Sequence, residues 1–269
     1  MRWMDMTRPD FEALPADVAL VWPLGSTEQH GEHLPVGTDT LIVTDLVERI
    51  ERAQPDRVLL LPTLPVGASH HHRAFPGAIS LPEGIYSAVL QEAVGGLIES
   101  DVCAPGRAKR ILLLNAHGGN IAPGQAALSE IAWRWRARPE VIVAFTSYWV
   151  ATADAIAKVP METPALTHAC EYETSMVLAL AGQLVHMERA RAKSMRWEGT
   201  RFTPDASRPP TVSVAAPFHA RSANGALGRP DLATAEKGRL LLDAIAADLI
   251  AFIDEFIAWP DLVDAREKG

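Results

Sequence analysis

The sequence predicts an α/β protein of three layers (α/β/α), with helices on both faces of a mostly parallel sheet. Four short runs rich in Val, Ile and Leu are apolar without alternation, which is typical of strands buried on both faces. Segments whose apolar residues recur every three or four positions separate these runs and are typical of amphipathic helices. Repeated strand–helix units of this kind favour parallel strands covered by helices.

The elements alternate regularly over the first half of the chain. The predicted strands cover residues 18–25, 57–65, 109–116 and 140–147. The predicted helices cover residues 39–53, 84–100, 121–137, 171–182 and 232–259. Residues 199–230 are rich in Pro, Gly, Ser and Arg, and we expect a long excursion with one short strand near 211–215. A loop of this length serves as a lid, an interface arm or a poorly ordered segment. No composition change marks a boundary, so we expect one domain over residues 1–269.

Composition and charge narrow the function classes. The chain has 48% hydrophobic and 22% charged residues, close to the globular average, and a net charge of −8 without a basic cluster. We therefore expect neither nucleic acid nor a membrane surface as partner. The first residues contain acids and a proline where a signal peptide needs an apolar region, and no apolar run approaches the ~20 residues of a bilayer span. With only two cysteines, these features predict a cytoplasmic protein.

Polar side chains crowd the segment PLGSTEQHGEHLPVGTDT, residues 23–40, directly after the first predicted strand. Glu28 and His30 are two positions apart, so in extended backbone their side chains leave on the same face. Asp39 stands at the start of the next predicted helix, where it could equally serve as a helix cap. This loop offers little to a hydrophobic core, which favours a role in binding.

A second polar group, LLLNAHGGN at residues 112–120, ends the third predicted strand. His117 follows four apolar residues and precedes Gly118 and Gly119, which allow a ligand to approach the backbone closely. In α/β sheets, ligands bind beyond the carboxyl ends of the strands. We therefore expect this loop and residues 23–40 to share one rim of the sheet.

The third group is THACEYETS, residues 167–175. His168 and Glu171 are three positions apart, so they would share one face if the chain is helical there, while Glu173 would point elsewhere. This spacing predicts that Glu171 faces the site. Glu173 is then a supporting acceptor, a helix cap or an ion-pair partner, although the sequence leaves open that the two glutamates exchange roles.

These segments supply a mixed set of imidazoles and carboxylates, the ligand chemistry of zinc and manganese. The candidate metal ligands are Glu28, His30, Asp39, His117 and Glu171. If Asp39 bridges, each of two ions receives three protein contacts and a water can lie between the ions, as a binuclear hydrolase requires. Two divalent ions and three carboxylates leave one net positive charge to stabilise hydroxide and an oxyanion. We therefore expect two divalent metal ions, Zn or Mn.

Together with LATAEKG (232–238) and FPGAIS (75–80), these motifs resemble the creatininase (creatinine amidohydrolase) family over most of the chain. The resemblance implies a three-layer fold, a two-metal site and usually a homohexamer. It places Glu28, His30, Asp39 and His117 on family metal ligands with Asp39 as the bridge. We expect Glu28 and His117 on one ion, and His30 with Glu171 on the other.

The sequence also departs from creatininase itself. Creatininase reads NGHYEN where this chain reads NAHGGN, so Gly119 stands at the position of a metal-binding glutamate; many relatives have Glu at the position of Glu171. Trp149 falls on a tryptophan that lines the creatininase pocket, and His168 falls on its proton-handling histidine. Pro164 replaces the lid tryptophan, which puts creatinine in doubt as the substrate.

The resulting functional hypothesis is hydrolysis of a non-peptide or small-peptide C–N bond, with a small cyclic or linear non-peptide amide as the expected substrate. A water between the ions would attack the carbonyl carbon, and His168 would deliver a proton to the departing nitrogen. The expected site residues are His168 and Glu171 as catalytic groups, Trp149, His72, Gly118 and Gly119 around the substrate, and Glu173 and His33 behind the ligands.

Several alternatives stay open. Within the family, a peptidase or a deformylase would use the same site. A binding protein on the same fold could hold a metabolite without turning it over. Cys170 could act as a nucleophile, although a free cysteine is more often a small buried residue. In the run of residues 70–72, adjacent histidines cannot all face one ion, so an exposed turn is the simpler interpretation for most of it.

Overall fold

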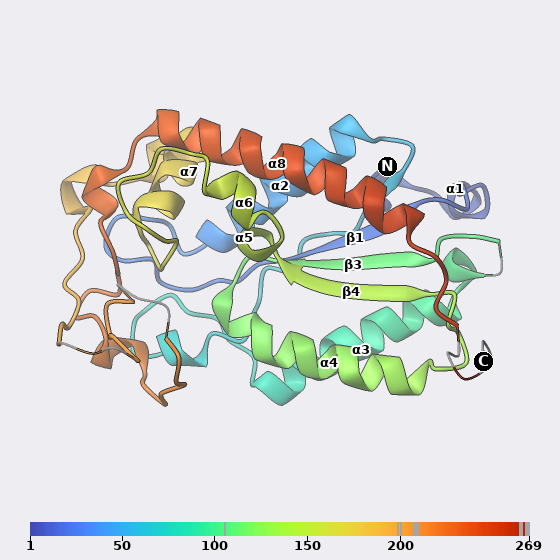
Figure 1. Ribbon diagram of the computed structural model, residues 1–269, viewed down its shortest axis with the longest axis horizontal. Helices are drawn as coiled ribbons and strands as arrows, with labels where there is room; N and C mark the ends of the chain where they lie inside the picture. Colours follow the sequence, from blue (N-terminus) through green and yellow to red (C-terminus); the bar gives the residue numbers. More distant parts are fainter. Residues whose placement is uncertain (105, 198, 200, 207–209, 264–265, 267–269) are drawn as a thin grey trace.

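A four-stranded parallel sheet forms the middle layer of the computed structural model (Figure 1), which describes residues 1–104, 106–197, 199, 201–206, 210–263 and 266. The strands are β1 (Ala19–Leu24), β2 (Val58–Leu60), β3 (Arg110–Asn115) and β4 (Ile142–Ser147). Their order in the sheet is β2-β1-β3-β4, and every neighbouring pair is parallel. The predicted fold class is therefore confirmed.

Helices connect the strands and cover both faces of the sheet. The α-helices are α1 (Arg8–Glu12), α2 (Thr38–Ala53), α3 (Glu83–Glu99), α4 (Ile121–Arg134), α5 (Tyr148–Ala151), α6 (Ala153–Ile156), α7 (Glu171–Ala181) and α8 (Ala235–Ala258). Short 3₁₀ helices are η1 (Trp3–Asp5), η2 (His70–His72), η3 (Asp101–Cys103), η4 (Gly118–Asn120), η5 (Gly182–Leu184), η6 (Met187–Arg189), η7 (Phe218–Ala220) and η8 (Pro230–Leu232). None of the described helices is both long enough and apolar enough to cross a membrane.

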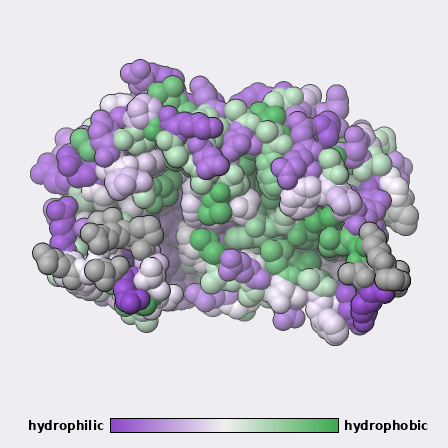
Figure 2. All heavy atoms as spheres, viewed as in Figure 1, coloured by the Kyte–Doolittle hydropathy of each residue, from purple (hydrophilic) through white to green (hydrophobic). Residues whose placement is uncertain are grey.

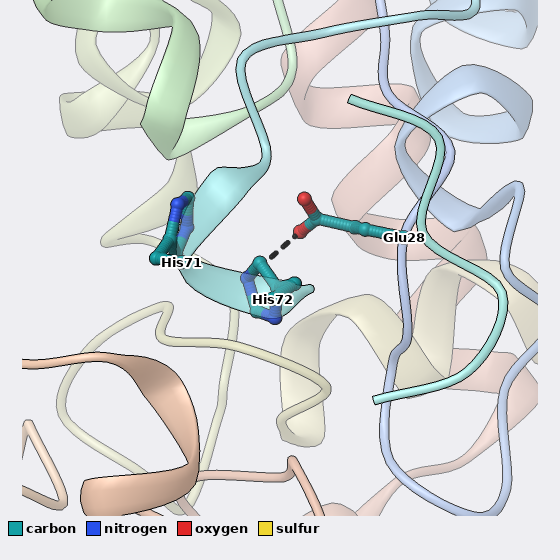
Figure 3. A group of neighbouring side chains, drawn as sticks. All are labelled: Glu28, His71 and His72. Atoms are coloured by element: carbon teal, nitrogen blue, oxygen red, sulfur yellow. Dashed lines mark ion pairs between the residues drawn. The ribbon is translucent and has the colours of Figure 1, made fainter. Parts of the chain in front are cut away.

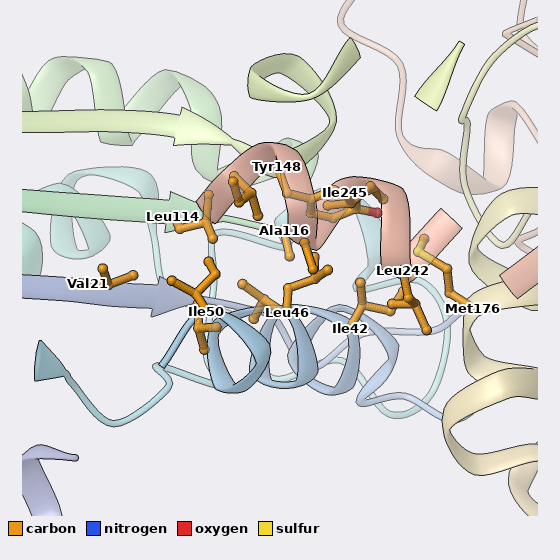
Figure 4. Close-up of a cluster of buried hydrophobic side chains, with 14 of the residues drawn as sticks. Val21, Ile42, Leu46, Ile50, Leu114, Ala116, Tyr148, Met176, Leu242 and Ile245 are labelled. Carbon is orange, nitrogen blue, oxygen red and sulfur yellow. The ribbon is translucent and has the colours of Figure 1, made fainter. Parts of the chain in front are cut away.

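Two hydrophobic cores form, one on each side of the sheet. Helices α2, α7 and α8 cover one face, whereas α3 and α4 cover the other (Figure 1). The apolar residues Ile42, Leu46 and Ile50 recur every four positions, so they form one buried stripe of α2 (Figure 4). Side chains from the sheet and from α8 complete that core, among them Val21, Leu114, Leu242 and Ile245. The second core includes Leu20, Leu90, Val94, Ile111 and Ile131.

The strand order places the site. From β1 the chain turns through α2 to β2 on one side, and β3 lies on the other side of β1, so the order reverses between β1 and β3. Loops that leave such a switch point diverge and open a crevice at the carboxyl ends of the strands. Leu24 pairs with Asn115 at the ends of these two strands. The loops that follow them therefore begin side by side, as expected for residues 23–40 and 112–120.

The region of residues 199–230 differs from the prediction. Its described residues contain no strand at 211–215; bends lead instead into η7. β-Branched residues favour a strand only where a neighbouring strand offers hydrogen bonds, and none lies alongside here within the described residues. Residues 207–209 lie outside the described part. The region contributes Ala206, Phe218 and Arg221 to the lining of a cavity.

Candidate metal centre and active site

A cavity of about 310 Å³ opens where the loops after β1 and β3 meet the start of α7. Its lining comprises Glu28, Asp39, His71, His72, Ala116, His117, Gly118, Gly119, Trp149, Leu166, Thr167, His168, Glu173, Ala206, Phe218, Arg221 and Leu227. Most of the site residues predicted from the sequence are in this set. The three polar segments, far apart along the chain, therefore converge on one place.

Two groups of possible metal donors share one aspartate. Glu28, Asp39 and His117 each offer a donor atom, and these atoms lie within 4.8 Å of one another. The same holds for His30, Asp39 and Glu173, and every member of both groups is buried. His117 Nδ1 is 3.2 Å from Asp39 Oδ2, and His30 Nε2 is 3.1 Å from Asp39 Oδ1. Asp39 thus presents one oxygen to each group.

The geometry suits divalent cations. Protein donors bind Zn²⁺ at about 2.0–2.3 Å, so the donors of one ion lie within about 4.5 Å of each other. Both carboxylate oxygens of Glu28 are buried, and neither has a hydrogen bond of good geometry in the described part of the chain; His72 Nε2 and His117 Nε2 each lie 3.2 Å away. Such orphaned acceptors are costly unless a cation compensates them. The donor set of carboxylates and imidazoles is one that zinc and manganese accept.

The carboxylates draw positive charge into the cluster. Burial disfavours the protonated form of His117, but Glu28 and Asp39 outweigh it and raise the pKa of His117 to about 10. Burial is likewise outweighed at His30, whose pKa Asp39 and Glu173 raise to about 9. The site therefore requires positive charge beside its carboxylates, and bound divalent ions would supply that charge in place of the protons.

The structure corrects the assignment of the two glutamates of α7. Glu173 points into the cluster, whereas Glu171 does not. The buried Glu171 carboxylate accepts hydrogen bonds from the N–H groups of Glu162 (3.1 Å) and Thr163 (2.8 Å) and from Lys237 Nζ (2.7 Å). Burial opposes ionisation, but these hydrogen bonds lower the pKa of Glu171 to about 2. Glu171 therefore fastens the loop before α7, and its carboxylate lies outside the donor groups to which the sequence assigned it.

The error has a local cause. The spacing argument assumed a helix through His168, yet α7 begins only at Glu171. Ala169 has φ +50°, a left-handed conformation that is rare for a residue with a side chain, and Cys170 is extended. This turn breaks the assumed helix face. It also brings the Ala169 N–H to the Glu173 carboxylate, which accepts its hydrogen bond.

The loop after β3 has no room for a side chain at Gly119. A Cβ at this position would lie 2.3 Å from the carbonyl oxygen of Ala68 and 2.4 Å from His117 Nε2. No side chain fits there without moving backbone, so the loop after β3 cannot supply a glutamate. Glu173, on α7, contributes a carboxylate to the group of His30 and Asp39.

Gln29, beside Glu28, sets the tautomer of a neighbouring histidine. Its Oε1 accepts the N–H of Gly31 at 2.9 Å, so its amide nitrogen points the other way. That nitrogen lies 3.1 Å from the carbonyl oxygen of Gly225 and 2.7 Å from His72 Nδ1, acceptors that use both amide hydrogens. The neutral ring of His72 therefore carries its proton on Nε2, which lies 3.2 Å from Glu28 Oε1 (Figure 3).

The backbone of Gln29 orients His168. His168 Nε2 lies 2.9 Å from the Gln29 carbonyl oxygen, which can only accept, so the proton is on Nε2 and the lone pair is on Nδ1. The 3.2 Å approach of Nε2 to the Gln29 amide nitrogen then joins two donors and is no hydrogen bond. Nδ1 is 3.8 Å from Glu28 Oε1. Burial and the neighbouring His30 lower the pKa of His168 to about 3, so its ring is neutral.

We expect Gln29→Met to lower metal affinity or hydrolysis about 10- to 100-fold, because the His72 ring that Gln29 orients contacts Glu28, one of the candidate metal ligands. Methionine preserves the length of the side chain but cannot hold His72 in one tautomer. Metal titration, together with the ¹⁵N chemical shifts of the histidine rings, would measure this change. Gln91→Met is the matched control, since Gln91 on α3 donates to Ser87 Oγ away from the cavity. Equal behaviour of the two variants would contradict the assigned role.

The remaining predicted residues fall into two groups. Trp149, His72, Gly118 and Gly119 line the cavity. His33 is buried outside the cavity lining, and its Nε2 is 2.9 Å from Thr174 Oγ1.

Two simpler interpretations can also be compared with the structure. Of the histidine run at 70–72, His71 and His72 both face the cavity, so an exposed turn describes only His70. Cys170 is fully buried, and burial raises the pKa of its thiol to about 12, which argues against a nucleophilic thiolate.

Sequence reasoning missed several cavity or support residues with functional side chains. Among them are Gln29, His71, Phe218 and Arg221. Gln29 could have been suspected from its place between two candidate ligands. Phe218 and Arg221 lie in the irregular region, where no periodicity reveals which side chains turn inward.

Comparison with known proteins agrees with this geometry. The sequence matches the profile of the family described as Creatininase (creatinine amidohydrolase) over residues 4–253. The mycofactocin precursor peptide peptidase of Mycobacterium tuberculosis is 30% identical over 252 residues, covering 90% of this chain and 87% of that protein. The creatinine amidohydrolase of Pseudomonas putida is 28% identical over 268 residues, covering 93% and 95% of the two chains.

Solved structures show the same likeness. A mutant creatininase complexed with creatine matches with a TM-score of 0.77 and 25% identity, over 96% of this chain and 99% of that one. A mutant creatininase of Zn–Zn type (TM-score 0.76, 96% and 98% covered) and a creatininase with Mn (0.73, 96% and 99%) are also 25% identical. On the evidence of its motifs, its parallel sheet and these matches over nearly its whole length, the chain belongs to the creatininase family.

Proposed function

We propose that this protein is a binuclear metal-dependent hydrolase that cleaves the C–N bond of a small cyclic or linear amide. The observation that carries the proposal is the pair of three-donor groups that share Asp39. A site with two such groups can hold two ions close together, which is the arrangement that activates a water between them. The relatives named above, a peptidase and an amidohydrolase, both bear names for amide-bond cleavage.

Each ion has its own protein donors in this proposal. Glu28, Asp39 and His117 would hold one ion, and His30, Asp39 and Glu173 the other. Zinc and manganese both suit these donors, and creatininase structures of a Zn–Zn type and with Mn support this choice. When bound, the ions polarise the substrate carbonyl and lower the pKa of water.

The residues of the chain then handle the proton and the substrate. His168 presents an unprotonated Nδ1 beside the cluster, so it can take a proton and pass it to the departing nitrogen. The backbone of Gly118 and Gly119 lies at the cavity wall, where its N–H groups can face the oxyanion. Trp149 and Leu166 form apolar walls that hold the substrate and exclude water.

A short peptide is the substrate class that the relatives favour within this reaction. The M. tuberculosis relative is named for a precursor peptide, and the match covers most of both chains. Pro164, at the position of the creatininase lid tryptophan, does not line the cavity. Leu166 and Thr167, the next residues along the chain that line the cavity, offer no aromatic ring, so of the two pocket tryptophans that the resemblance implies Trp149 alone is present.

Metal removal and restoration test the proposal. The protein would be treated with a chelator and reloaded with Zn²⁺ or Mn²⁺, then assayed on cyclic amides, formamides and short peptides. We expect about two ions per chain, and hydrolysis that falls to background with the chelator and returns with metal. Unchanged hydrolysis in the chelator would contradict the mechanism. Two bound ions with no hydrolysis of any class would favour the metabolite-binding alternative.

We also propose that the protein is a cytoplasmic homo-oligomer, as the resemblance to hexameric relatives implies. Apolar residues gather on the face that Figure 2 shows, over the region where Figure 1 draws β4 and α4. A hollow of about 320 Å³ there is lined by Ile131, Trp135 and Val143, and Trp133 on α4 is 68% exposed. A second copy of the chain would cover such a surface. Sedimentation of a monomer alone would contradict this.

A further inference from the structure

We propose that Arg221 forms a subsite for a carboxylate group of the substrate, so that the substrates of this protein are amides that also carry a carboxylate. The inference rests on the proposed function, because it assigns a recognition role within the same cavity. It narrows the substrate class further than the metal donors can, since they recognise only the amide.

Arg221 is connected to the histidines of the site through a single side chain, Phe218. It follows η7 and lines the cavity that contains the metal donors. The Phe218 ring centroid lies 4.2 Å from that of His72 and 4.7 Å from that of His168. Arg221 Cζ lies 5.3 Å from the same Phe218 centroid, so this ring contacts both the guanidinium and the two histidines beside the metal donors. A substrate with its amide at the metal donors would pass Phe218 and reach the guanidinium with a distal group.

The two terminal nitrogens of the Arg221 guanidinium are available as hydrogen-bond donors for a ligand. Its Nε donates to the carbonyl oxygen of Pro204 at 3.0 Å. Within the residues that the structure describes, neither terminal nitrogen of Arg221 makes a hydrogen bond or an ion pair. Two terminal nitrogens in one plane form a fork that matches the two oxygens of a carboxylate. The side chain is thus anchored at one end and ready to bind at the other.

The charges of the cavity also favour an anion at this point. Arg221 is the single lysine or arginine among the described residues of the lining, where the acidic groups are the proposed metal ligands. Burial lowers the pKa of Arg221, and Asp205 raises it in part. Asp205 Oδ2 itself lies 3.5 Å from Arg196 Nε, so its charge is shared. A substrate carboxylate would offset the cost of burying this cation.

A purely structural role is the alternative. Arg221 joins the carbonyl oxygen of Pro204 to Phe218, so it could serve only to fasten residues 203–206 over η7. Loss of such a fastening would lower stability and weaken every substrate alike. Loss of a carboxylate subsite would weaken only carboxylate-bearing substrates.

The test compares three peptides that share one kind of amide bond. They are glycyl-phenylalanine, its C-terminal carboxamide, and glycyl-glutamic acid α-amide, which carries its carboxylate on a side chain. Calorimetric binding and hydrolysis would be measured with metal-loaded wild type, Arg221→Met and Arg221→Lys. Arg229→Met is the matched control, because Arg229 is exposed, pairs with Asp231 at 2.6 Å and lies outside the cavity lining.

We expect wild type to prefer one carboxylate peptide over the carboxamide by about 10- to 100-fold, the usual gain from a hydrogen bond to a charged group. Arg221→Met should erase this preference, Arg221→Lys should restore part of it, and Arg229→Met should retain it. The preferred carboxylate peptide shows whether the group sits at the peptide end or on a side chain. If Arg221→Met fails to fold, as judged by circular dichroism, Arg221→Gln takes its place.

Two results would overturn the subsite. One is a wild type with no preference, and the other is a preference that survives in Arg221→Met. The proposed function fails separately: selective binding that depends on Arg221, without hydrolysis by the metal-loaded protein, would support the subsite and contradict the hydrolase. Hydrolysis without carboxylate preference would do the opposite.

Discussion

Asp39→Asn is expected to reduce hydrolysis at least about 100-fold and to remove at least one metal ion per chain, the largest effect of any single substitution here. Asp39 is the one residue common to both donor groups, and its two oxygens approach His30 and His117 separately. Asparagine has the same shape but offers one neutral oxygen in place of two charged ones. It can therefore serve one ion at most, and weakly.

The measurement is metal content by mass spectrometry, alongside hydrolysis of whichever substrate the panel identifies. Asp45→Asn is the matched control on the same helix, because Asp45 pairs with Arg49 at 2.5 Å and is absent from both donor groups. Circular dichroism would show whether each variant is folded. If the Asp39→Asn protein retained two ions and normal turnover, the proposal that Asp39 bridges the two ions would be contradicted.

A second large effect separates the two glutamates of α7. Glu173→Gln should lose the ion that His30 and Asp39 share and reduce hydrolysis about 100-fold or more, because it removes a charged donor. Glu171→Gln should retain both ions, since its carboxylate faces Lys237, Thr163 and the Glu162 backbone. Each substitution changes one carboxylate to an amide of equal size, so each is the control for the other.

Glu171→Gln should instead lower the free energy of unfolding by about 1–3 kcal/mol, the usual cost of a buried hydrogen-bonded group left partly unsatisfied. The amide cannot accept from Lys237 as a carboxylate does, and its NH₂ group meets other donors. Chemical denaturation would measure this loss. If Glu171→Gln lost metal and Glu173→Gln did not, the sequence-based assignment would stand and the geometry described here would be contradicted.

Much of the fold could be predicted from the sequence because its signals are local. The apolar runs at β1 and β3 are continuous since both faces of each strand are covered, and that burial is visible in the run itself. The stripe of Ile42, Leu46 and Ile50 on α2 follows from helix periodicity. The predicted strand at 211–215 was wrong because β-propensity alone cannot supply a neighbouring strand.

The residues of the candidate site also divide into those that the sequence could predict and those that it could not. Glu28, His30 and His117 lie in the loops that follow β1 and β3, so the rule that ligands bind beyond strand ends was enough to bring them together. Glu173 could not be separated from Glu171, because the choice depends on the φ of +50° at Ala169. An alanine in that conformation leaves no trace in composition or spacing. Arg221 lies in an irregular segment, where only tertiary contacts decide which side chains face inward.

By itself the sequence determined the layered architecture, the family and most of the candidate metal donors, because periodicity and position after a strand are properties of neighbouring residues. Tertiary structure alone decided which glutamate of α7 enters the cluster and which histidine tautomers Gln29 imposes. It also decided that the Arg221 guanidinium lines the cavity, where it can bind a substrate carboxylate. Those outcomes depend on atoms brought together from distant segments: Gly119 leaves no room for a side chain, and the turn at Ala169 redirects the start of α7.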